Sequence, residues 1–313
     1  MFMWVITLGL EERIRKTKEN NMVGIVIKWN EKAVVKKILL FCLLTFLPIL
    51  SIAQVTFLPK DSITVCRFLR QAPKDAGTLW FARQFIGKPY VAHTLEINND
   101  ERLVVNTREL DCTTLVETVV ALTLCKQQEK KEWKDYLNML QTLRYRQGKL
   151  DDYPSRLHYF SDWIDDKQSM SLVKEIQGPN PPFTAIQQLD ICFMSEHSQL
   201  YKALKAHPEL VPAIREQEEV LTGRKYRYIP KSAINNSMLL RKTVHDGDII
   251  AITTNKKGLD IAHLGFAVWH KDGLHLLNAS MLRKEVVEEP MTFRQYLKKH
   301  PSHTGIRVIR INE

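Results

Sequence analysis

The stretch Asp111-Cys112-Thr113-Thr114-Leu115-Val116-Glu117 places a cysteine where a loop turns into a helix. Asp111 is a favourable N-cap residue, and apolar residues follow it at helical spacing. We therefore expect Cys112 in the first helical turn, where free backbone N–H groups and the helix dipole favour a thiolate. This placement predicts a nucleophilic cysteine. The alternative is a small cysteine that only packs in a core.

The segments on either side of this helix predict an α+β fold. Helical spacing is found over residues 62–71 and 75–85, and again over residues 129–222. From residue 225 onward, short β-branched runs predict strands at 248–253, 261–269, 274–280 and 305–311, with a short helix at 292–299. Helices followed by antiparallel strands are typical of the α+β class. We expect the Cys112 helix to pack on the antiparallel sheet.

Residues 1–53 have the layout of a signal peptide. Two lysines precede an apolar run over residues 38–50, and small residues at 51 and 53 suit cleavage before Gln54. An uncleaved anchor is the alternative, although the run is short for a membrane span. We expect an exported, periplasmic protein that meets the membrane only through this segment. Residues 54–313 would then form a single catalytic domain, with a helical insertion at about 129–222.

Composition limits the partners of the exported chain. The whole chain has a formal net charge of +10, with 45 basic and 35 acidic residues. Removing the leader, which has eight Lys or Arg and four Asp or Glu, leaves a mild surplus of +6. No basic helix interleaved with aromatic residues suggests a nucleic-acid partner.

Four cysteines remain after residue 53, and their spacing fits neither a zinc site nor a disulfide scaffold. Cys66 and Cys125 are interpreted as core residues. One Cys66–Cys192 bridge stays open, because export permits disulfides. We expect no metal and no cofactor.

A nucleophilic cysteine needs a base, and His263 is the best candidate. It lies in the predicted strand 261–269, where alternation places it on one face with Gly265 and Ala267. These small residues leave room beside the imidazole for another element, such as the Cys112 helix. The alternative is a structural histidine at a strand edge.

Asn278, in the next predicted strand, is the candidate that orients His263. A two-residue turn at Asp272-Gly273 would pair position 271 with 274, and would leave Asn278 about 13 Å out of register. A bulge or a strong twist would have to shorten that offset. The alternative is an asparagine that bonds its own strand end.

Tyr90 is a further candidate, in the sequence Gly87-Lys88-Pro89-Tyr90. Gly87 ends a predicted helix and Pro89 stiffens the chain that leaves it. The Tyr90 hydroxyl would then be held in place to help the Cys112 N–H stabilise an oxyanion. The alternative is a half-buried loop aromatic.

In this order, these residues resemble the papain-like NlpC-type cell-wall amidases and peptidases. The resemblance rests on residues 87–90, 111–116, 246–249, 262–265 and 278–280. The wider chain, including Tyr153–Tyr159 and Tyr228–Lys231, is similar to the N-acetylmuramoyl-L-alanine amidase-like branch over nearly all of residues 60–312.

The resemblance implies a papain-like, NlpC-type α+β fold with a helical insertion. It also implies an amidase that cleaves between muramic acid and L-alanine, in anhydro-muropeptides. Cys112 would attack the amide, His263 would act as base and then acid, Asn278 would orient His263, and Tyr90 would help the oxyanion. The partners would be peptidoglycan fragments. Two alternatives stay open: an endopeptidase for the D-glutamyl–diamino acid bond, and an inactive peptidoglycan-binding protein.

A polar and aromatic cluster in the insertion supplies the candidate substrate contacts, which are Tyr153, Ser155, Arg156, His158 and Trp163. We expect Arg156 to hold a peptide carboxylate and Trp163 to stack on a sugar. Lys231 is a second candidate carboxylate contact. The alternative for the cluster is the start of a helix with ordinary packing.

Overall fold

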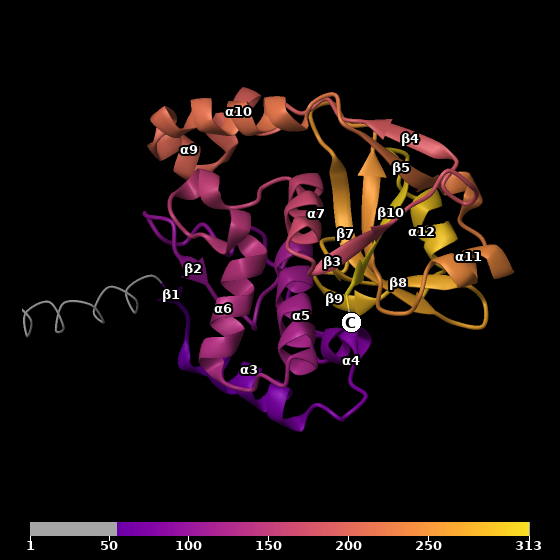
Figure 1. The fold of residues 1–313 in the computed structure, drawn as a ribbon, viewed down its shortest axis with the longest axis horizontal. Helices are drawn as coiled ribbons and strands as arrows, with labels where there is room; N and C mark the ends of the chain where they lie inside the picture. The colour runs from indigo at the N-terminus through magenta and orange to yellow at the C-terminus, as the bar shows by residue number, and fades with distance from the viewer. Residues whose placement is uncertain (1–54, 313) are drawn as a thin grey trace, which may run out of the picture. The chain divides into compact units, whose positions relative to one another are not determined.

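The computed structural model describes residues 55–312 (Figure 1). The expected signal peptide therefore lies outside the described residues. The described chain is a mixed α+β domain built on an antiparallel sheet. Within residues 55–312, no helix has both the length and the apolar character needed to cross a membrane.

The sheet has the strand order β4-β5-β10-β6-β7-β8-β9, and β3 also pairs with β10. Its strands are β3 (Val173–Ile176), β4 (Ala185–Gln188), β5 (Lys225–Pro230), β6 (Ile249–Thr254), β7 (Ile261–Trp269), β8 (Leu274–Ser280), β9 (Glu285–Glu288) and β10 (His303–Ile311). Every pairing in this sheet is antiparallel. A separate short parallel pair joins β1 (Val55–Thr56) to β2 (Leu103–Val104).

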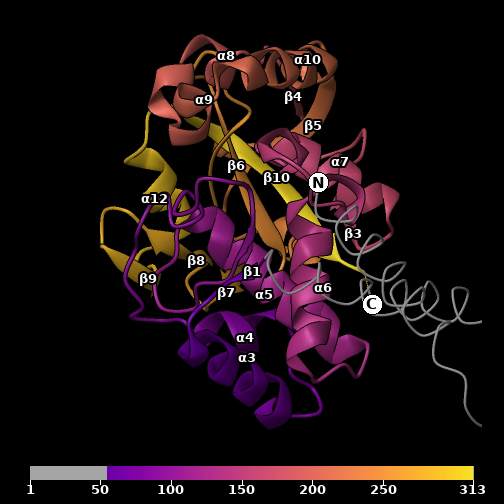
Figure 2. The same ribbon diagram turned by 90° about the vertical axis from the view of Figure 1, so that its left-hand side faces the viewer.

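The α-helices are α3 (Pro59–Gln71), α4 (Thr78–Arg83), α5 (Cys112–Gln127), α6 (Trp133–Arg144), α7 (Phe160–Ser169), α8 (Phe193–Glu196), α9 (Lys202–Ala206), α10 (Val211–Leu221), α11 (Met238–Thr243) and α12 (Phe293–Lys298). Five 3₁₀ turns connect them: η1 (Arg146–Gly148), η2 (Tyr153–Ser155), η3 (Ser198–Leu200), η4 (Pro208–Leu210) and η5 (Lys231–Ala233). α8, α9 and α10 lie together, away from α3 and α4 (Figure 2).

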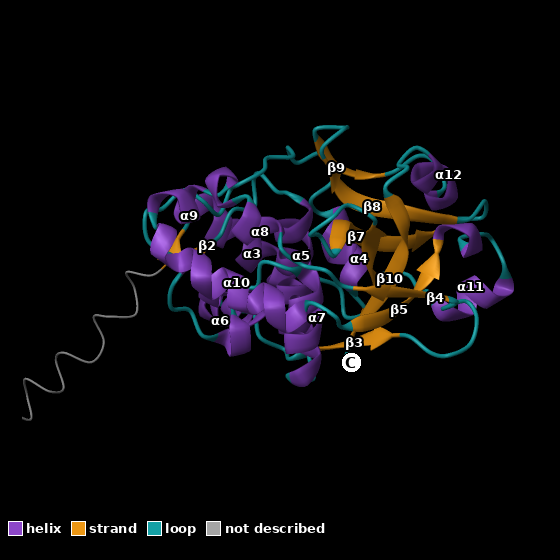
Figure 3. Ribbon diagram, turned by 90° about the horizontal axis from the view of Figure 1, so that it is seen from above, coloured by secondary structure: helices purple, strands orange, loops and turns teal. Residues whose placement is uncertain are grey.

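The sheet has a helical layer on each face, with α5 and α6 on one side and α11 and α12 on the other (Figure 3). From Thr114 to Cys125 every residue of α5 is buried. A helix that is buried on all sides lies in the interior, so α5 is the central helix of the domain, with its buried Glu117 paired to Arg144. One core cluster joins α5 to Leu264, Phe266 and Val268 of β7. A second cluster joins Ala267 to α12 on the opposite face.

The sequence predicted β7 and β8 at their observed bounds, but it was wrong about the insertion. Residues 129–222 are not wholly helical, because β3 and β4 lie within this range and extend the sheet. β3 has the alternating burial of a strand, yet its four residues are too short a signal to stand out beside longer helices. β9 was also missed.

Candidate active site

Cys112 is the first residue of α5, as the sequence predicted. The Asp111 carboxylate accepts a hydrogen bond from the Thr114 N–H at 2.8 Å, and the Asp111 N–H donates to the Thr114 hydroxyl at 2.9 Å. This reciprocal pair is a capping box that fixes where the helix begins. It therefore also fixes the position of the half-buried Cys112 side chain.

The thiol does not have the lowered pKa that the helix start suggested. Burial raises the pKa of Cys112 to about 12, and the negative charge of Asp111 adds to this rise. Hydrogen bonds from the Leu264 N–H and from Thr113 act in the opposite direction but are weaker. The prediction of a resting thiolate was wrong, because desolvation outweighs the helix N-terminus. Cys112 rests as a neutral thiol.

His263 and Asn278 are hydrogen-bonded to each other. The distance from His263 Nε2 to Asn278 Oδ1 is 2.9 Å. An amide oxygen only accepts hydrogen bonds, so the imidazole proton is on Nε2 and Nδ1 keeps its lone pair. Burial lowers the pKa of His263, although the Asn278 bond opposes this effect. His263 is therefore a neutral base at pH 7.

The predicted register between β7 and β8 was wrong by two positions. Trp269 pairs with Leu274, so the connection has four residues rather than two. The N–H of His270 closes it by donating to the Gly273 carbonyl at 2.9 Å. The longer turn moves Asn278 toward His263, and the 13 Å offset does not arise.

The predicted contact face of β7 also needs correction. Leu264 and Phe266 pack against α5, whereas Ala267 packs on the α12 side. Alternation places His263 on the α12 face with Ala267. The recorded pairing of β7 with β8 ends at Phe266. Leu264 precedes that end of the pairing on β7, and its backbone N–H contacts the Cys112 sulfur.

Cys112 and His263 line one open cleft of about 220 Å³. Its walls come from the start of α5, the start of β7 and the segment that includes Tyr153 and His158. The ring Nε2 of His158 lies 2.9 Å from the Tyr153 carbonyl. Burial lowers the pKa of His158 to about 3, and the Arg156 charge lowers it further, so this ring is neutral. Three histidines line the cleft, His93, His158 and His263, and the last two are neutral imidazoles beside a neutral thiol.

Tyr90 is fixed by backbone hydrogen bonds on two sides. Its N–H donates to the Lys284 carbonyl at 2.8 Å, and the neighbouring Pro89 carbonyl accepts from the Leu110 N–H at 3.1 Å. Leu110 immediately precedes the capping residue of α5, so the same contacts position Tyr90 and Cys112. Burial raises the pKa of Tyr90 to about 12, and Cys112, when ionised, and Asp111 add to this rise. The phenol is protonated and able to donate, although it does not line the 220 Å³ cleft.

Arg156 and Ser155 are already engaged within the protein. Arg156 is buried, and its Nη2 lies 2.7 Å from Glu96 Oε1 and 3.4 Å from Glu101 Oε2. The Ser155 hydroxyl donates to the Asp152 carbonyl at 2.6 Å and closes its own turn. The structure therefore places neither side chain where it is free to hold a carboxylate.

Trp163 and Lys231 lie outside the cleft. Trp163 is only 1% exposed and stacks on Phe160 with ring centroids 4.8 Å apart, so its ring has no free face for a sugar. The Lys231 ammonium donates to the His300 carbonyl at 3.0 Å. Of the predicted substrate contacts, only Tyr153 and His158 line the cleft.

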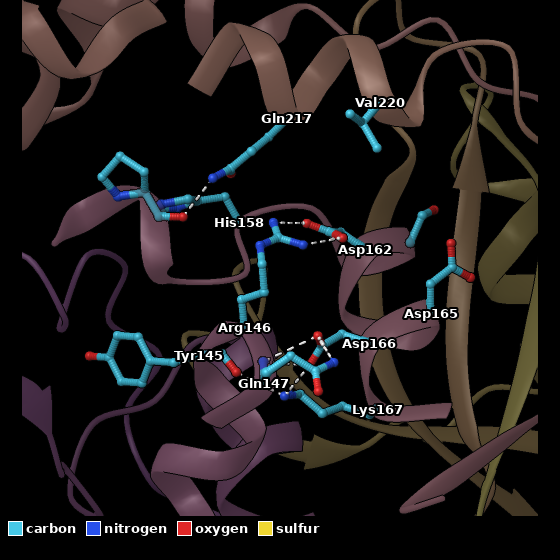
Figure 4. A network of polar contacts seen from close by, with 12 residues as sticks. Tyr145, Arg146, Gln147, His158, Asp162, Asp165, Asp166, Lys167, Gln217 and Val220 are labelled. Atoms are coloured by element: carbon cyan, nitrogen blue, oxygen red, sulfur yellow. Dashed lines mark hydrogen bonds and ion pairs between the residues drawn. The ribbon is translucent and has the colours of Figure 1, made fainter. Parts of the chain in front are cut away.

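A polar network, buried at Asp166 and Lys167, holds the segment that leads to these two residues (Figure 4). The Lys167 ammonium donates to the Tyr145 carbonyl at 2.9 Å and pairs with Asp166 at 2.6 Å. Asp166 in turn accepts from the Gln147 side chain at 2.8 Å. Arg146 binds Asp162 with both of its terminal nitrogens. These contacts tie the end of α6 to α7, and so fix one wall of the cleft.

Several residues near the thiol and imidazole were missed from the sequence, among them His93 and Tyr201 of the cleft lining and also Tyr296, His300 and Glu289. Burial raises the pKa of Tyr296, and Glu289 and an ionised Cys112 would raise it further, while His300 and Glu289 act on the pKa of His263. Tyr296 and His300 are four residues apart, and their rings lie 4.5 Å apart. That spacing at the end of a predicted helix was the only signal in the sequence. Within residues 55–312, no three His, Cys, Asp or Glu side chains are arranged as metal ligands.

The sequence model of the N-acetylmuramoyl-L-alanine amidase-like family matches residues 80–306. The chain belongs to this family. The matched range contains Tyr90, Cys112, His263 and Asn278. A comparison with curated proteins found no match.

Solved structures agree with membership of the amidase-like family. An N-acetylmuramoyl-L-alanine amidase from Bacteroides uniformis is 42% identical, with a TM-score of 0.71 over 75% of this chain and 97% of that chain. A Bacteroides fragilis protein, solved as a candidate xylanase, is 43% identical, with a TM-score of 0.69 over 74% of this chain and 99% of that chain. A Legionella pneumophila protein is 20% identical and shares the fold, with a TM-score of 0.63 over 81% of this chain and 95% of that chain.

Proposed function

We propose that this member of the amidase-like family is a papain-like, NlpC-type cysteine amidase. It hydrolyses the amide bond between N-acetylmuramic acid and L-alanine, with anhydro-muropeptides as substrates. The observation that carries the proposal is the His263–Asn278 pair, with His263 lining the same cleft as Cys112. The family match and the amidase from Bacteroides uniformis support the choice of bond.

The resting state of the proposed reaction is a neutral thiol beside a neutral imidazole. Burial raises the pKa of Cys112 and lowers that of His263, and both shifts favour the neutral pair over a thiolate–imidazolium pair before substrate binds. The Cys112 sulfur therefore attacks the amide carbon while its proton moves to His263 Nδ1. This is general-base catalysis of a covalent step.

Attack forms a tetrahedral intermediate whose oxygen carries the negative charge. The backbone N–H of Cys112 and the Tyr90 hydroxyl are the donors proposed for this oxyanion. His263 then gives its proton to the alanine nitrogen, the C–N bond breaks, and the peptide leaves as an amine. The muramoyl group stays on Cys112 as a thioester.

Water completes the cycle through the same residues. His263 Nδ1 takes a proton from the water that attacks the thioester, and returns it to the departing sulfur. The products are a free muramoyl carboxylate and the peptide. Asn278 holds the imidazole in one tautomer throughout, because its oxygen accepts the Nε2 proton.

The carboxylates of the cleft favour an amidase over the glycosidase suggested for one relative. Glycosidases use two carboxyl groups on either side of the scissile bond. In this cleft Glu96 pairs with Arg156, and Asp260 is buried and accepts from the Ser161 N–H at 2.7 Å. Both carboxylates are engaged in structural contacts.

The test is digestion of defined muropeptides by wild type and by Cys112→Ala, followed by mass spectrometry. Wild type should release the sugar with a free lactyl carboxylate plus the intact peptide, and Cys112→Ala should give no product while keeping its melting temperature. Cys66→Ala, also a half-buried cysteine, is the matched control and should keep full activity. A shortened stem peptide would show the endopeptidase instead, and retention on peptidoglycan without products would show a binding protein.

The proposed location is the periplasm, on the basis of the leader sequence at residues 1–53. N-terminal sequencing of the protein recovered from that compartment should begin at Gln54. An N-terminus upstream of the apolar run would indicate an uncleaved anchor.

A further inference from the structure

A second hollow of about 260 Å³ adjoins the Cys112 cleft. Glu96 and Tyr153 line both spaces, so the two are neighbours along one surface. Neither the sequence prediction nor the proposed reaction gives this second hollow, here termed the acidic annex, a role.

Carboxylates dominate the acidic annex. Its lining contains six of them, Glu96, Asp100, Glu101, Asp151, Asp152 and Glu209, and no lysine or arginine among the described residues. Two cations lie close behind: Arg156 pairs with Glu96 and Glu101, and the Lys202 ammonium donates to the Glu96 carbonyl at 3.2 Å. His207 contacts Glu209 at 3.0 Å.

Three of the six carboxylates have no partner in the described part of the chain. The side chains of Asp100, Asp151 and Asp152 make no ion pair and no hydrogen bond there, and all three are exposed. Their carboxylates therefore face solvent at the annex without a partner from residues 55–312. A cation that entered would meet them first.

Tyr153 supplies an independent sign of a ligand. Its side chain is 5% exposed and lines both the annex and the cleft, yet its hydroxyl has no hydrogen-bond partner within residues 55–312. The oxygen itself reaches the open space of these hollows, because it is not among the buried polar atoms that lack a partner. It is therefore free to bond a ligand that enters. A phenol oxygen can accept a hydrogen bond from an ammonium group.

The wall between the two spaces is rigid. The Arg156 guanidinium lies 4.8 Å from the centre of the Tyr153 ring, and the Tyr145 hydroxyl donates to Glu101 at 2.8 Å. Glu96 and Glu101 are thus held by neighbours on the protein side. Such fixed carboxylates and an open hydroxyl form a prepared site rather than a loose cluster.

The geometry points to the acidic annex as the site that binds the side-chain ammonium group of the substrate peptide. This inference rests on the proposed amidase function, and it identifies the preferred substrate as a stem peptide with a free amine on its diamino acid. The peptide then runs from Cys112 past Tyr153 toward the annex.

The test separates binding from cleavage. Calorimetry with Cys112→Ala compares L-alanyl-D-isoglutamyl-L-lysine with the same peptide acetylated on the lysine amine. An exposed ion pair contributes a factor of about two in affinity, so three unpaired aspartates predict about eightfold tighter binding of the free amine. The preference should shrink in 0.5 M salt, where the Debye length is only about 4 Å.

Removing the three charges should abolish the preference. In the Cys112→Ala background, Asp100→Asn/Asp151→Asn/Asp152→Asn should bind both peptides with the weaker affinity. Asp75→Asn/Asp190→Asn/Glu219→Gln removes the same charge from exposed acids elsewhere and should keep the eightfold preference.

Equal affinities of Cys112→Ala for the two peptides would overturn the inference. A preference for the free amine that survives replacement of the three aspartates would overturn it as well. Neither result touches the amidase proposal, which stands or falls on cleavage of muropeptides by wild type. Conversely, binding that prefers the free amine, together with no cleavage of muropeptides by wild type, would support the annex as an ammonium site and refute the amidase proposal.

Discussion

Replacing Asn278 with alanine tests whether this side chain positions the base. Asn278 is fully buried, and its oxygen accepts the His263 Nε2 proton at 2.9 Å. Its amide nitrogen has no partner in the described residues. Asn278→Ala therefore removes the hydrogen bond to the imidazole, and it breaks no other side-chain hydrogen bond within residues 55–312.

The expected loss of activity follows from when that hydrogen bond is strongest. A bond between neutral groups contributes about 1 kcal/mol, and one to a charged group contributes about 1.5–3 kcal/mol. His263 is neutral in the resting state and positive once it holds the thiol proton. The bond is therefore strongest after proton transfer, and its loss should lower kcat by roughly 10- to 150-fold.

The pH profile distinguishes this role from general damage to the fold. Burial lowers the pKa of His263 and the Asn278 bond raises it, so removing the bond lowers that pKa further. The base then stays unprotonated at lower pH, and the acid limb of the kcat/KM profile should shift to lower pH. Asn278→Asp places a negative charge beside the imidazole, and should shift the same limb to higher pH.

The assay is the release of peptide from a muropeptide between pH 4 and 9, with melting temperature as the control for folding. A twofold or smaller drop in kcat for Asn278→Ala would refute the positioning role. So would an acid limb that moves in the same direction in both variants, because their electrostatic effects on His263 are opposite.

Three further substitutions test the remaining assignments. Tyr90→Phe removes a proposed oxyanion donor and should lower kcat about 100-fold with little change in melting temperature; a change confined to KM would contradict that role. Trp163→Phe should cost roughly 2 kcal/mol of unfolding free energy in urea and leave KM unchanged, because this ring packs on Phe160 inside the core; a raised KM at wild-type stability would instead support sugar stacking. Arg307 of β10 and Glu175 of β3 form a buried ion pair, with Arg307 Nε 2.5 Å from Glu175 Oε1. Arg307→Met leaves the Glu175 carboxylate buried without this partner and should cost about 3–5 kcal/mol in the same assay; Arg307→Met/Glu175→Met should recover most of the loss, and a double variant as unstable as the single one would refute this expectation.

Local signals predicted the parts of the site that depend on neighbouring residues. The start of α5 followed from Asp111 and the apolar residues after it, and its capping box is a contact between residues three apart. The bounds of β7 and β8 followed from their β-branched composition and flanking turns. The His263–Asn278 contact was anticipated because both lie on adjacent strands, even though the turn length was misjudged.

Contacts between distant segments could not be predicted in this way. Arg156 is occupied by Glu96 and Glu101, which lie more than fifty residues earlier in the chain. Trp163 is buried because the domain closes around α7, and nothing in its local sequence distinguishes a core ring from an exposed platform. The raised pKa of Cys112 likewise reflects burial by the folded chain, which no local pattern reports.

The start of α5 still has an electrostatic role, although it does not produce a resting thiolate. A helix N-terminus stabilises negative charge by about 0.3–1 kcal/mol at a surface and by up to about 2 kcal/mol in a partly buried site. Burial of Cys112 raises its pKa to about 12, so this contribution is too small to ionise the sulfur. In the proposed reaction the negative charge forms on the substrate oxygen, next to the free N–H of the same helical turn. The N-terminus of α5 therefore stabilises the negative charge of the tetrahedral intermediate rather than a thiolate in the free enzyme. This stabilisation raises kcat.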